Sequence, residues 1–442
     1  MSIIEKITSE KAGKIIKRRY LKRDQPEQVE KNINRRESKM KSLKGFIEKH
    51  YKEQDLIELT QELIRIPSHV NHPGREREVG LFLGEYLKDR GLKVKIDEVM
   101  DGRVNVIATL KGSGGGKNLL LNGHLDTVPP GEMDFDPYEG ALVGGMIQGR
   151  GAVDMKGPIA SMVTMMLALK NSGMTFKGDV IFTGVIGEEE KSEGTEKIVK
   201  DGIQADGAIV GEPSSYEYSA GHRGLEWLEI EIEGRAAHGG MPHLGVNAIE
   251  KAATFIERVK DELYPKIKER SHPLMGSSVM NFGHIKGGIQ PSTVAGKCII
   301  QIDRRYVPGE TPQSVIQEYQ DIIDQLQQED ETFQATIKRM ENNMLTLDHL
   351  PLATELEDPI TKAVTKALAT VLGKEPTLST KRGWTDASLL FNFGKIPTIV
   401  YGPGNISYSH TKNEQVAVKE LKEAVEVYFL AAAEFCGVEK EE

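Results

Sequence analysis

The sequence contains few of the residues on which several classes of protein depend. Only two of its 442 residues are cysteines, Cys298 and Cys436, which excludes a disulfide-stabilised scaffold and predicts a reducing compartment, by default the cytoplasm. No stretch reaches the roughly 18 apolar residues that a membrane-spanning helix needs, and the N-terminus lacks the apolar run of a secretory signal. We therefore expect neither secretion nor membrane insertion.

Basic residues are concentrated at the N-terminus, although the formal net charge of the chain is −9. Residues 1–50 hold 15 Lys and Arg against 7 Asp and Glu, which gives +8 there and leaves −17 on the remainder. These basic runs favour a solvated helical face over a contact with nucleic acid or membrane. We expect residues 1–50 to form a basic appendage without an assigned function, and we expect no nucleic-acid partner.

The length and the hydrophobic pattern predict an α/β domain that is interrupted by a second domain. One hydrophobic core rarely organises 442 residues. After residue 50, helical periodicity alternates with short runs that are apolar on both faces, typical of parallel strands covered by helices on each side. We expect such a domain, with a largely parallel sheet, to be built from residues 51–224 and 346–442. The apolar runs lie at 118–122, 180–186, 208–210 and 398–401.

A different sheet is predicted from about residue 225. There Leu228, Ile230 and Ile232 alternate with glutamates, which is the pattern of a strand with one wet face. The segments that follow predict the order β-α-β-β-α-β. We therefore expect an inserted domain at 225–345.

Acidic and imidazole side chains follow each predicted parallel strand, at the edge where open α/β sheets bind ligands. The segments are GHLDTVPPG, GEEE, GEP and YSH. Alone, His124 could be a loop histidine, Asp154 a capping residue in a Gly-rich turn, and Glu188 to Glu190 a solvated helix start. A charged side chain at the edge of a buried core costs free energy unless a partner balances its charge. Four such segments together therefore predict a metal site.

In sequence order, the motifs over about 50–440 resemble a family of co-catalytic metallopeptidases. That family includes acetylornithine deacetylase, succinyl-diaminopimelate desuccinylase, aminoacylase and bacterial glutamate carboxypeptidase. The resemblance is carried by NGHLDTVPPG, GRGAVDMKG, GEEEKSEGT, VGEPS, GRAAHGGMPHLGVNAI, DRRYVPG, YGPG and SHTKNE.

The resemblance implies a site for two metal ions. His124 and Glu212 would bind one ion, Glu189 and His410 the other, and Asp154 would bridge them, with the ions roughly 3.5–4 Å apart. Imidazole and carboxylate ligands without a thiolate suit Zn²⁺, with Co²⁺ or Mn²⁺ as alternatives.

Two further carboxylates have implied roles. Asp126 would accept the second ring N–H of His124, and Glu188 would be the catalytic base. The family usually has Asp-Glu-Glu where this chain has Gly-Glu-Glu-Glu, so a shift of one residue would move the roles to Glu189 and Glu190.

The inserted domain resembles the lid and dimerisation domain of the family. A histidine matching His238 there reaches the partner subunit's active site and stabilises an oxyanion. Arg305 matches a residue that holds a substrate carboxylate, whereas Arg304 should point to the opposite face of its strand. Other substrate-side positions, for which a turn or cap role stays open, are Asn247, Gly402 and Gly404.

These residues predict a homodimeric amidohydrolase that releases the acyl group from a small N-acyl amino acid. Glu212 favours a deacylase or carboxypeptidase, because aminopeptidases of the family tend to have Asp at that position. A dipeptidase or carboxypeptidase is the alternative, and a non-catalytic binding protein on the same fold is a third reading.

Overall fold

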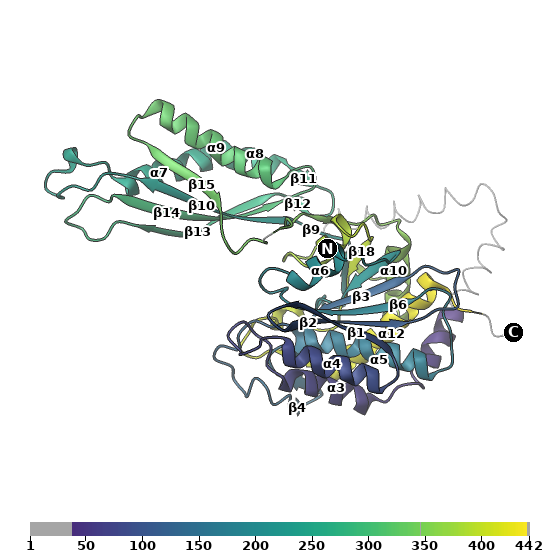
Figure 1. Ribbon diagram of the computed structural model, residues 1–442. Helices are drawn as coiled ribbons and strands as arrows, with labels where there is room; N and C mark the ends of the chain where they lie inside the picture. The colour runs from purple at the N-terminus through teal and green to yellow at the C-terminus, as the bar shows by residue number, and fades with distance from the viewer. Residues whose placement is uncertain (1–37, 345, 440–442) are drawn as a thin grey trace, which may run out of the picture.

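The largest sheet, of eight strands, forms the centre of a three-layered α/β domain (Figure 1). The computed structural model describes residues 38–344 and 346–439, so most of the expected basic appendage lies outside the described residues. The eight strands follow the order β1-β2-β6-β3-β7-β18-β8-β17, in which β6, β3, β7 and β18 are parallel neighbours. Their bounds are β1 Lys93–Met100, β2 Arg103–Leu110, β3 Leu119–His124, β6 Val180–Val185, β7 Gly207–Val210, β8 Glu217–Ser219, β17 Thr377–Ser379 and β18 Thr398–Val400.

The central strands are apolar on both faces because helices cover both sides of the sheet. In β3, Leu119 and Leu121 face one core, which is shared with the long helices, while Leu120 faces a second core with Ile198 and Leu390. The predicted fold class is therefore confirmed. The first face is covered by α3 (Glu53–Arg65), α4 (Arg77–Asp89), α5 (Gly157–Asn171), α10 (Pro359–Leu372) and α12 (Val418–Cys436), and the second by α6 (Glu193–Lys200) and α11 (Ala387–Asn392).

Helix α5 is apolar around its whole circumference because it lies between the sheet and the outer helices. Contrary to the expectation from the sequence, the segment Ala152–Asn171 is long and apolar enough on average to cross a membrane, but 94% of its window of 18 residues is buried inside the protein. It contacts α3, α12 and the strands β3 and β6. It is thus a core helix, and its N-terminal turn reaches the edge where the parallel strands end.

The inserted domain has a four-stranded antiparallel sheet in the order β13-β14-β10-β15, with helices on one face (Figure 1). Ile230 and Ile300 point to the helices, whereas Glu229 and Glu231 lie on the other face and pair with lysines. The predicted wet face is therefore present. The elements, in the predicted order, are β10 (Gly224–Glu233), α7 (Ala248–Arg258), β13 (Val279–Gly287), β14 (Lys297–Tyr306), α9 (Pro312–Glu329) and β15 (Gln334–Arg339), with the short helix α8 (Tyr264–Glu269) after α7.

The C-terminal part of the expected appendage packs on the core of the α/β domain. Residues 38–47 are helical, and Met40 and Ile47 are buried among the residues of the main core. Lys44 pairs with Glu426 of α12. The domain divisions at 50/51, 224/225 and 345/346 stay predictions, but this helix belongs to the packing of the α/β domain.

Two buried histidines lie where the chain passes between the eight-stranded sheet and the four-stranded sheet. His222 ends β9 (Gly221–His222), and the carbonyl of His349 accepts a hydrogen bond of 2.9 Å from the backbone N–H of Leu225. The Trp384 ring lies edge-on to both imidazoles. Burial lowers the pKa of His222 to about 4 and that of His349 to about 3.

These two histidines should make the protein less stable in acid. In the unfolded chain each imidazole takes up a proton near pH 6.5, but in the folded protein it stays neutral to a lower pH. The unfolded state then binds more protons, so stability falls as pH drops below 6.5 and is unaffected above it. At pH 5 each histidine should contribute about 2 kcal/mol to the loss.

Urea unfolding of the wild type and of His222→Gln and His349→Gln at pH 7.5 and pH 5 measures this contribution. Each variant should lose about 2 kcal/mol less than the wild type between the two pH values. The exposed His243→Gln serves as the control and should lose as much as the wild type. An equal acid loss in all four proteins would contradict the assignment.

Candidate metal centre

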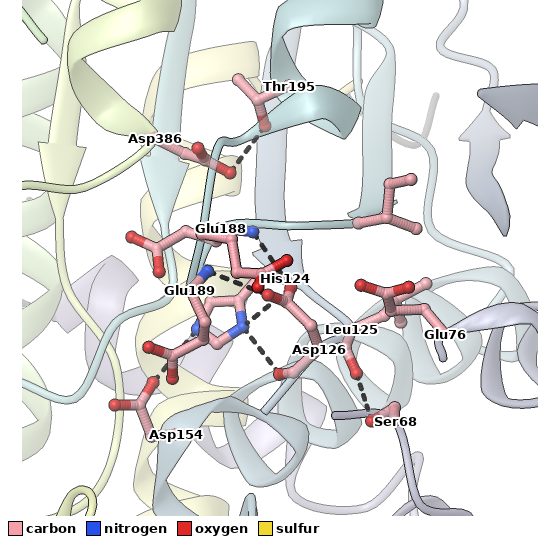
Figure 2. A network of polar contacts seen from close by, with 12 residues as sticks. Ser68, Glu76, His124, Leu125, Asp126, Asp154, Glu188, Glu189, Thr195 and Asp386 are labelled. Carbon is pink, nitrogen blue, oxygen red and sulfur yellow. Dashed lines mark hydrogen bonds and ion pairs between the residues drawn. The ribbon is translucent and has the colours of Figure 1, made fainter. Parts of the chain in front are cut away.

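The carboxyl ends of the four parallel strands meet at one edge of the large sheet. His124 is the last residue of β3, Glu188 and Glu189 follow β6, and Glu212 follows β7. Asp154 comes from the turn before α5, and its backbone is not helical (φ −130°, ψ 94°). Figure 2 shows the side chains of His124, Asp154, Glu188 and Glu189 converging from separate segments.

Asp154 lies between two histidines and offers one oxygen to each. Its Oδ1 is 3.1 Å from Nε2 of His124, and its Oδ2 is 3.3 Å from Nε2 of His410. Glu212 Oε1 lies 3.4 Å from His124 Nε2, and Glu189 Oε1 lies 2.9 Å from His410 Nε2. Two groups of three ligand atoms therefore share Asp154, and within each group all the atoms are within 4.8 Å of one another.

Asp126 connects the ends of β3 and β6. Its two carboxylate oxygens accept the backbone N–H groups of Glu188 (3.1 Å) and Glu189 (2.8 Å). His124 Nδ1 lies 2.9 Å from the backbone oxygen of Asp126 and 3.5 Å from its carboxylate. The residue expected to accept from His124 thus lies beside its ring, but its carbonyl is the nearer group, and its carboxylate holds the loop after β6.

Glu414 holds the backbone of Asp154 in place. Its Oε1 accepts the N–H groups of Val153 and Asp154, both at 3.1 Å, and its Oε2 pairs with the buried guanidinium of Arg150. Glu414 is fully buried. The sequence motif that contains His410 also contains Glu414, but no role for it was evident from the sequence, because its partners lie about 260 residues away.

The pKa shifts reflect burial set against ion pairing. Burial alone would lower the pKa of His124, but the surrounding carboxylates raise it well above its usual value. Burial alone would raise the pKa of Asp154, but its two histidines hold it well below its usual value. Burial, reinforced by Glu212, raises the pKa of Glu188 well above the normal range. The site therefore holds both ionised carboxylates and a carboxyl that retains a proton readily.

The donor atoms fit a pair of divalent cations. The buried Oε1 of Glu212 has no hydrogen-bond partner among the described residues, although it lies beside the imidazole of His124. A buried carboxylate oxygen without a donor is costly unless a cation balances it. Each group consists of one imidazole and two carboxylates, which suits Zn²⁺ and similar ions.

The three consecutive glutamates after β6 have different surroundings. Glu189 faces His410, whereas Glu190 pairs with Arg75 on the other side of the loop. Among the described residues, no hydrogen bond or ion pair is formed by the side chain of Glu188, which lies next to Asp386 in Figure 2. Only one of the three glutamates thus reaches a histidine.

Of two further residues that the sequence did not single out, Lys381 contacts a ligand and Asp386 is close enough for its charge to interact with His124. Lys381 Nζ lies 3.0 Å from Oε2 of Glu212. Asp386 is fully buried, accepts a hydrogen bond of 2.7 Å from Thr195, and has its pKa raised to about 7 by burial. Both come from the segment after β17, which has no strand-end histidine or acidic motif to mark it.

The residues predicted in the inserted domain lie apart from this cluster. His238 is exposed beyond the end of β10, and Asn247 caps α7 by accepting the N–H of Ile249. Arg304 is buried, whereas Arg305 is on the other face of β14 and forms two hydrogen bonds to Asp303. Among the described residues, no hydrogen bond or ion pair joins any of them to the two ligand groups.

The two glycines after β18 allow close packing against the ligand segments. A Cβ at Gly402 would lie 2.0 Å from the backbone oxygen of Gly211, next to Glu212. Gly404 has a φ of +99°, and a Cβ there would lie 2.1 Å from Val153, next to Asp154. Both positions thus require glycine for the site to assemble.

Comparisons with known proteins agree with this architecture. A family model described as Peptidase family M20/M25/M40 matches residues 120–434. A protein named probable succinyl-diaminopimelate desuccinylase, from Staphylococcus epidermidis, is 28% identical over 409 residues and covers 85% of this chain and 96% of its own. Acetylornithine deacetylase from Proteus mirabilis is 30% identical over 399 residues, with 87% and 97% covered. The crystal structure of aminopeptidase PepT from Bacillus cereus has a TM-score of 0.72 at 22% identity, covers 87% of this chain and 99% of its own, and shows a shared fold.

Replacing Asp126 with asparagine should weaken metal binding. The amide has one acceptor oxygen where the carboxylate has two, so one of the N–H groups of Glu188 and Glu189 would lose its partner. We expect Asp126→Asn to lower metal affinity about 10- to 100-fold in a competition titration against a chelator. Asp89→Asn, at the exposed end of α4, is the control. Equal affinities in both variants would show that Asp126 does not organise the site.

Proposed function

Because the chain belongs to the peptidase family M20/M25/M40, we propose that it uses two divalent metal ions to hydrolyse the amide bond of a small N-acyl amino acid or a related amine. The observation that supports this most directly is the carboxylate of Asp154, shared between two groups of nitrogen and oxygen donors. Hydrolases of amide bonds commonly use such paired sites.

The geometry supports a specific division of the ligands. His124 and Glu212 would hold one ion, Glu189 and His410 the other, and Asp154 would contact both through its separate oxygens. When bound, the pair of ions would polarise the scissile carbonyl and lower the pKa of the attacking water. The donor set favours Zn²⁺, with Co²⁺ or Mn²⁺ as alternatives.

Glu188 is the proton carrier in this proposal. Its backbone is fixed by Asp126, its side chain has no competing partner among the described residues, and burial raises its pKa. A carboxylate in this environment takes a proton from the attacking water as a general base and returns it to the departing amine. The pairing of Glu189 with His410 and of Glu190 with Arg75 supports this register over the one shifted by a residue.

The substrate class rests on Glu212 and on the named relatives. Glutamate at this position favours deacylases and carboxypeptidases over aminopeptidases. The two curated relatives described above are named as a desuccinylase and a deacetylase. We infer that the substrate carries a small acyl group on nitrogen and a carboxylate, for which Arg305 is the candidate binding group.

Dimerisation through the inserted domain would complete the site. The ten residues of β10 span roughly 30 Å, so His238 beyond its far end is too distant from the sheet edge of its own chain. We infer that His238 stabilises the oxyanion in the site of a second subunit, and that Asn247, at the start of the adjacent helix, approaches the same site. The exposed apolar residues of this region support such an interface; they are Met241, Leu244, Ile249, Ile285 and Ile289.

Hydrolysis assays on purified protein test the proposed chemistry. Protein stripped with a chelator and reloaded with Zn²⁺ or Co²⁺ is offered N-acetylornithine, N-acetyl-methionine, an N-succinyl amino acid and a simple dipeptide. Release of the acyl group, restored by metal, is the expected result. Cleavage of the dipeptide alone would favour a peptidase, and no cleavage with both ions bound would favour a binding protein.

The Glu188→Gln variant separates the base from metal binding. The amide keeps the shape of the side chain but does not accept the proton, so turnover should fall about 10²- to 10⁴-fold while two ions remain bound. The matched control is Glu190→Gln, because Glu190 pairs with Arg75 and does not face the histidines. Loss of activity in the control, with Glu188→Gln active, would favour the shifted register.

Mixed dimers test the role of His238. His238→Ala and Glu188→Gln should each be inactive alone, whereas a reassorted equal mixture should regain roughly a quarter of the wild-type rate. Half of its dimers contain one chain of each variant, and one of the two sites in such a dimer is intact. A mixture of Glu188→Gln with the double variant Glu188→Gln/His238→Ala should stay inactive. Full activity of His238→Ala alone, or no recovery in the first mixture, would contradict a contribution across subunits.

A further inference from the structure

Lys381 makes the two candidate metal positions different from each other. The His124 position comprises His124, Asp154 and Glu212, and the His410 position comprises His410, Asp154 and Glu189. Each has one imidazole, one glutamate and the shared aspartate, so the ligands alone predict similar affinities. Among the described residues, Lys381 is the one lysine or arginine that forms an ion pair with either glutamate.

The contact between Lys381 and Glu212 is buried and fixed at several points. The two side chains are only 9% and 6% exposed. Nζ also donates to the carbonyl of Pro213 (3.3 Å), and the backbone N–H of Lys381 donates to Ser219 Oγ (3.0 Å). Since Lys381 follows β17, which pairs in register with β8, both ends of the lysine are held.

The lysine occupies one oxygen of Glu212 and leaves the other free. Nζ binds Oε2, whereas Oε1 faces His124 and has no hydrogen-bond partner among the described residues. Glu212 is therefore oriented to bind an ion through a single oxygen. The same arrangement places a fixed positive charge within roughly 7 Å of any ion bound at Oε1, given metal–oxygen distances of about 2.0–2.2 Å.

Two opposing effects of Lys381 on metal affinity follow, and their magnitudes decide between them. Orienting a ligand is worth about 10- to 100-fold in affinity. Repulsion between a unit charge and a divalent ion at about 7 Å costs roughly tenfold even at the dielectric constant of water, and roughly a thousandfold at the effective dielectric of a protein. Because the pair is more than nine-tenths buried, screening is well below that of water and repulsion should prevail.

We propose that Lys381 is a positioning residue that weakens the ion at the His124 position, so that the His410 position fills first. This inference rests on the proposed dinuclear site but not on its catalytic activity.

Metal titration of the full-length, metal-stripped protein tests the proposal. Zn²⁺ is added in competition with a chelating dye, and Co²⁺ absorption reports the coordination of each ion in turn. The wild type should bind two ions in separate phases. Glu212→Gln should remove the weaker phase and Glu189→Gln the tighter one, which assigns the phases to the two positions.

The decisive variant is Lys381→Met, with Lys381→Arg as the matched control. Methionine keeps the length of the side chain but removes its charge, so the weaker ion should bind at least about tenfold more tightly, with a smaller gain for the more distant, tighter ion. Arginine keeps the charge and should keep the two phases apart. Circular dichroism and a stoichiometry of two ions confirm that each variant is folded.

An unchanged or weaker second phase in Lys381→Met would overturn the proposal, as would assignment of the tighter phase to the His124 position. These titrations need no substrate. If the expected phases appear but none of the amides is hydrolysed, the proposed function fails while the role of Lys381 stands.

Discussion

Charge balance at the edge of the large sheet is the constraint on which the rest of the structure depends. Parallel strands end together there, and the chain brings in carboxylates that repel one another and are largely withdrawn from water. Part of the compensation comes from the chain itself, through two imidazoles, one ammonium group and backbone N–H donors. The remaining negative charge is what a pair of divalent ions would balance. The carboxylates are those of Asp126, Asp154, Glu188, Glu189 and Glu212.

This charge balance depends on residues that fix the positions of the ligand residues. Asp126 fixes the loop after β6, Glu414 fixes the backbone of Asp154, and Lys381 orients Glu212. Each of these contacts joins segments that are distant in the sequence. Substitution of any of these residues would therefore change the geometry of the ligands without removing a ligand side chain.

In the inserted domain, the sequence pattern predicts on which face of a strand a residue lies, but not which distant residues it meets. Alternation along β10 and β14 predicts correctly that Arg304 and Arg305 lie on opposite faces, because successive side chains of a strand point to opposite sides. The same pattern does not say which residues of another segment lie opposite. The register that sets Arg305 opposite Leu225 of β10, and the exposure of His238 beyond the strand end, appear only in the folded chain.

The appendage and the register of the glutamates illustrate the limits of local signals. Composition set residues 1–50 apart, yet Met40 and Ile47 are buried in the main core, because three or four apolar residues on one helix face carry little weight beside a strong charge bias. The sequence left Glu188, Glu189 and Glu190 open to two registers. The structure separates them through His410 and Arg75, which no spacing rule brings to either glutamate.

The sequence alone determines two domains of known class and a set of ligand-type residues directly after buried strands. Such features depend on periodicity and on neighbours a few residues away, so they can be seen in a linear chain. The tertiary structure alone decided which oxygen faces which imidazole, and that Lys381 contacts Glu212 across 169 residues. Contacts of this kind depend on where separate segments meet in space, and they leave no periodic signal in either segment.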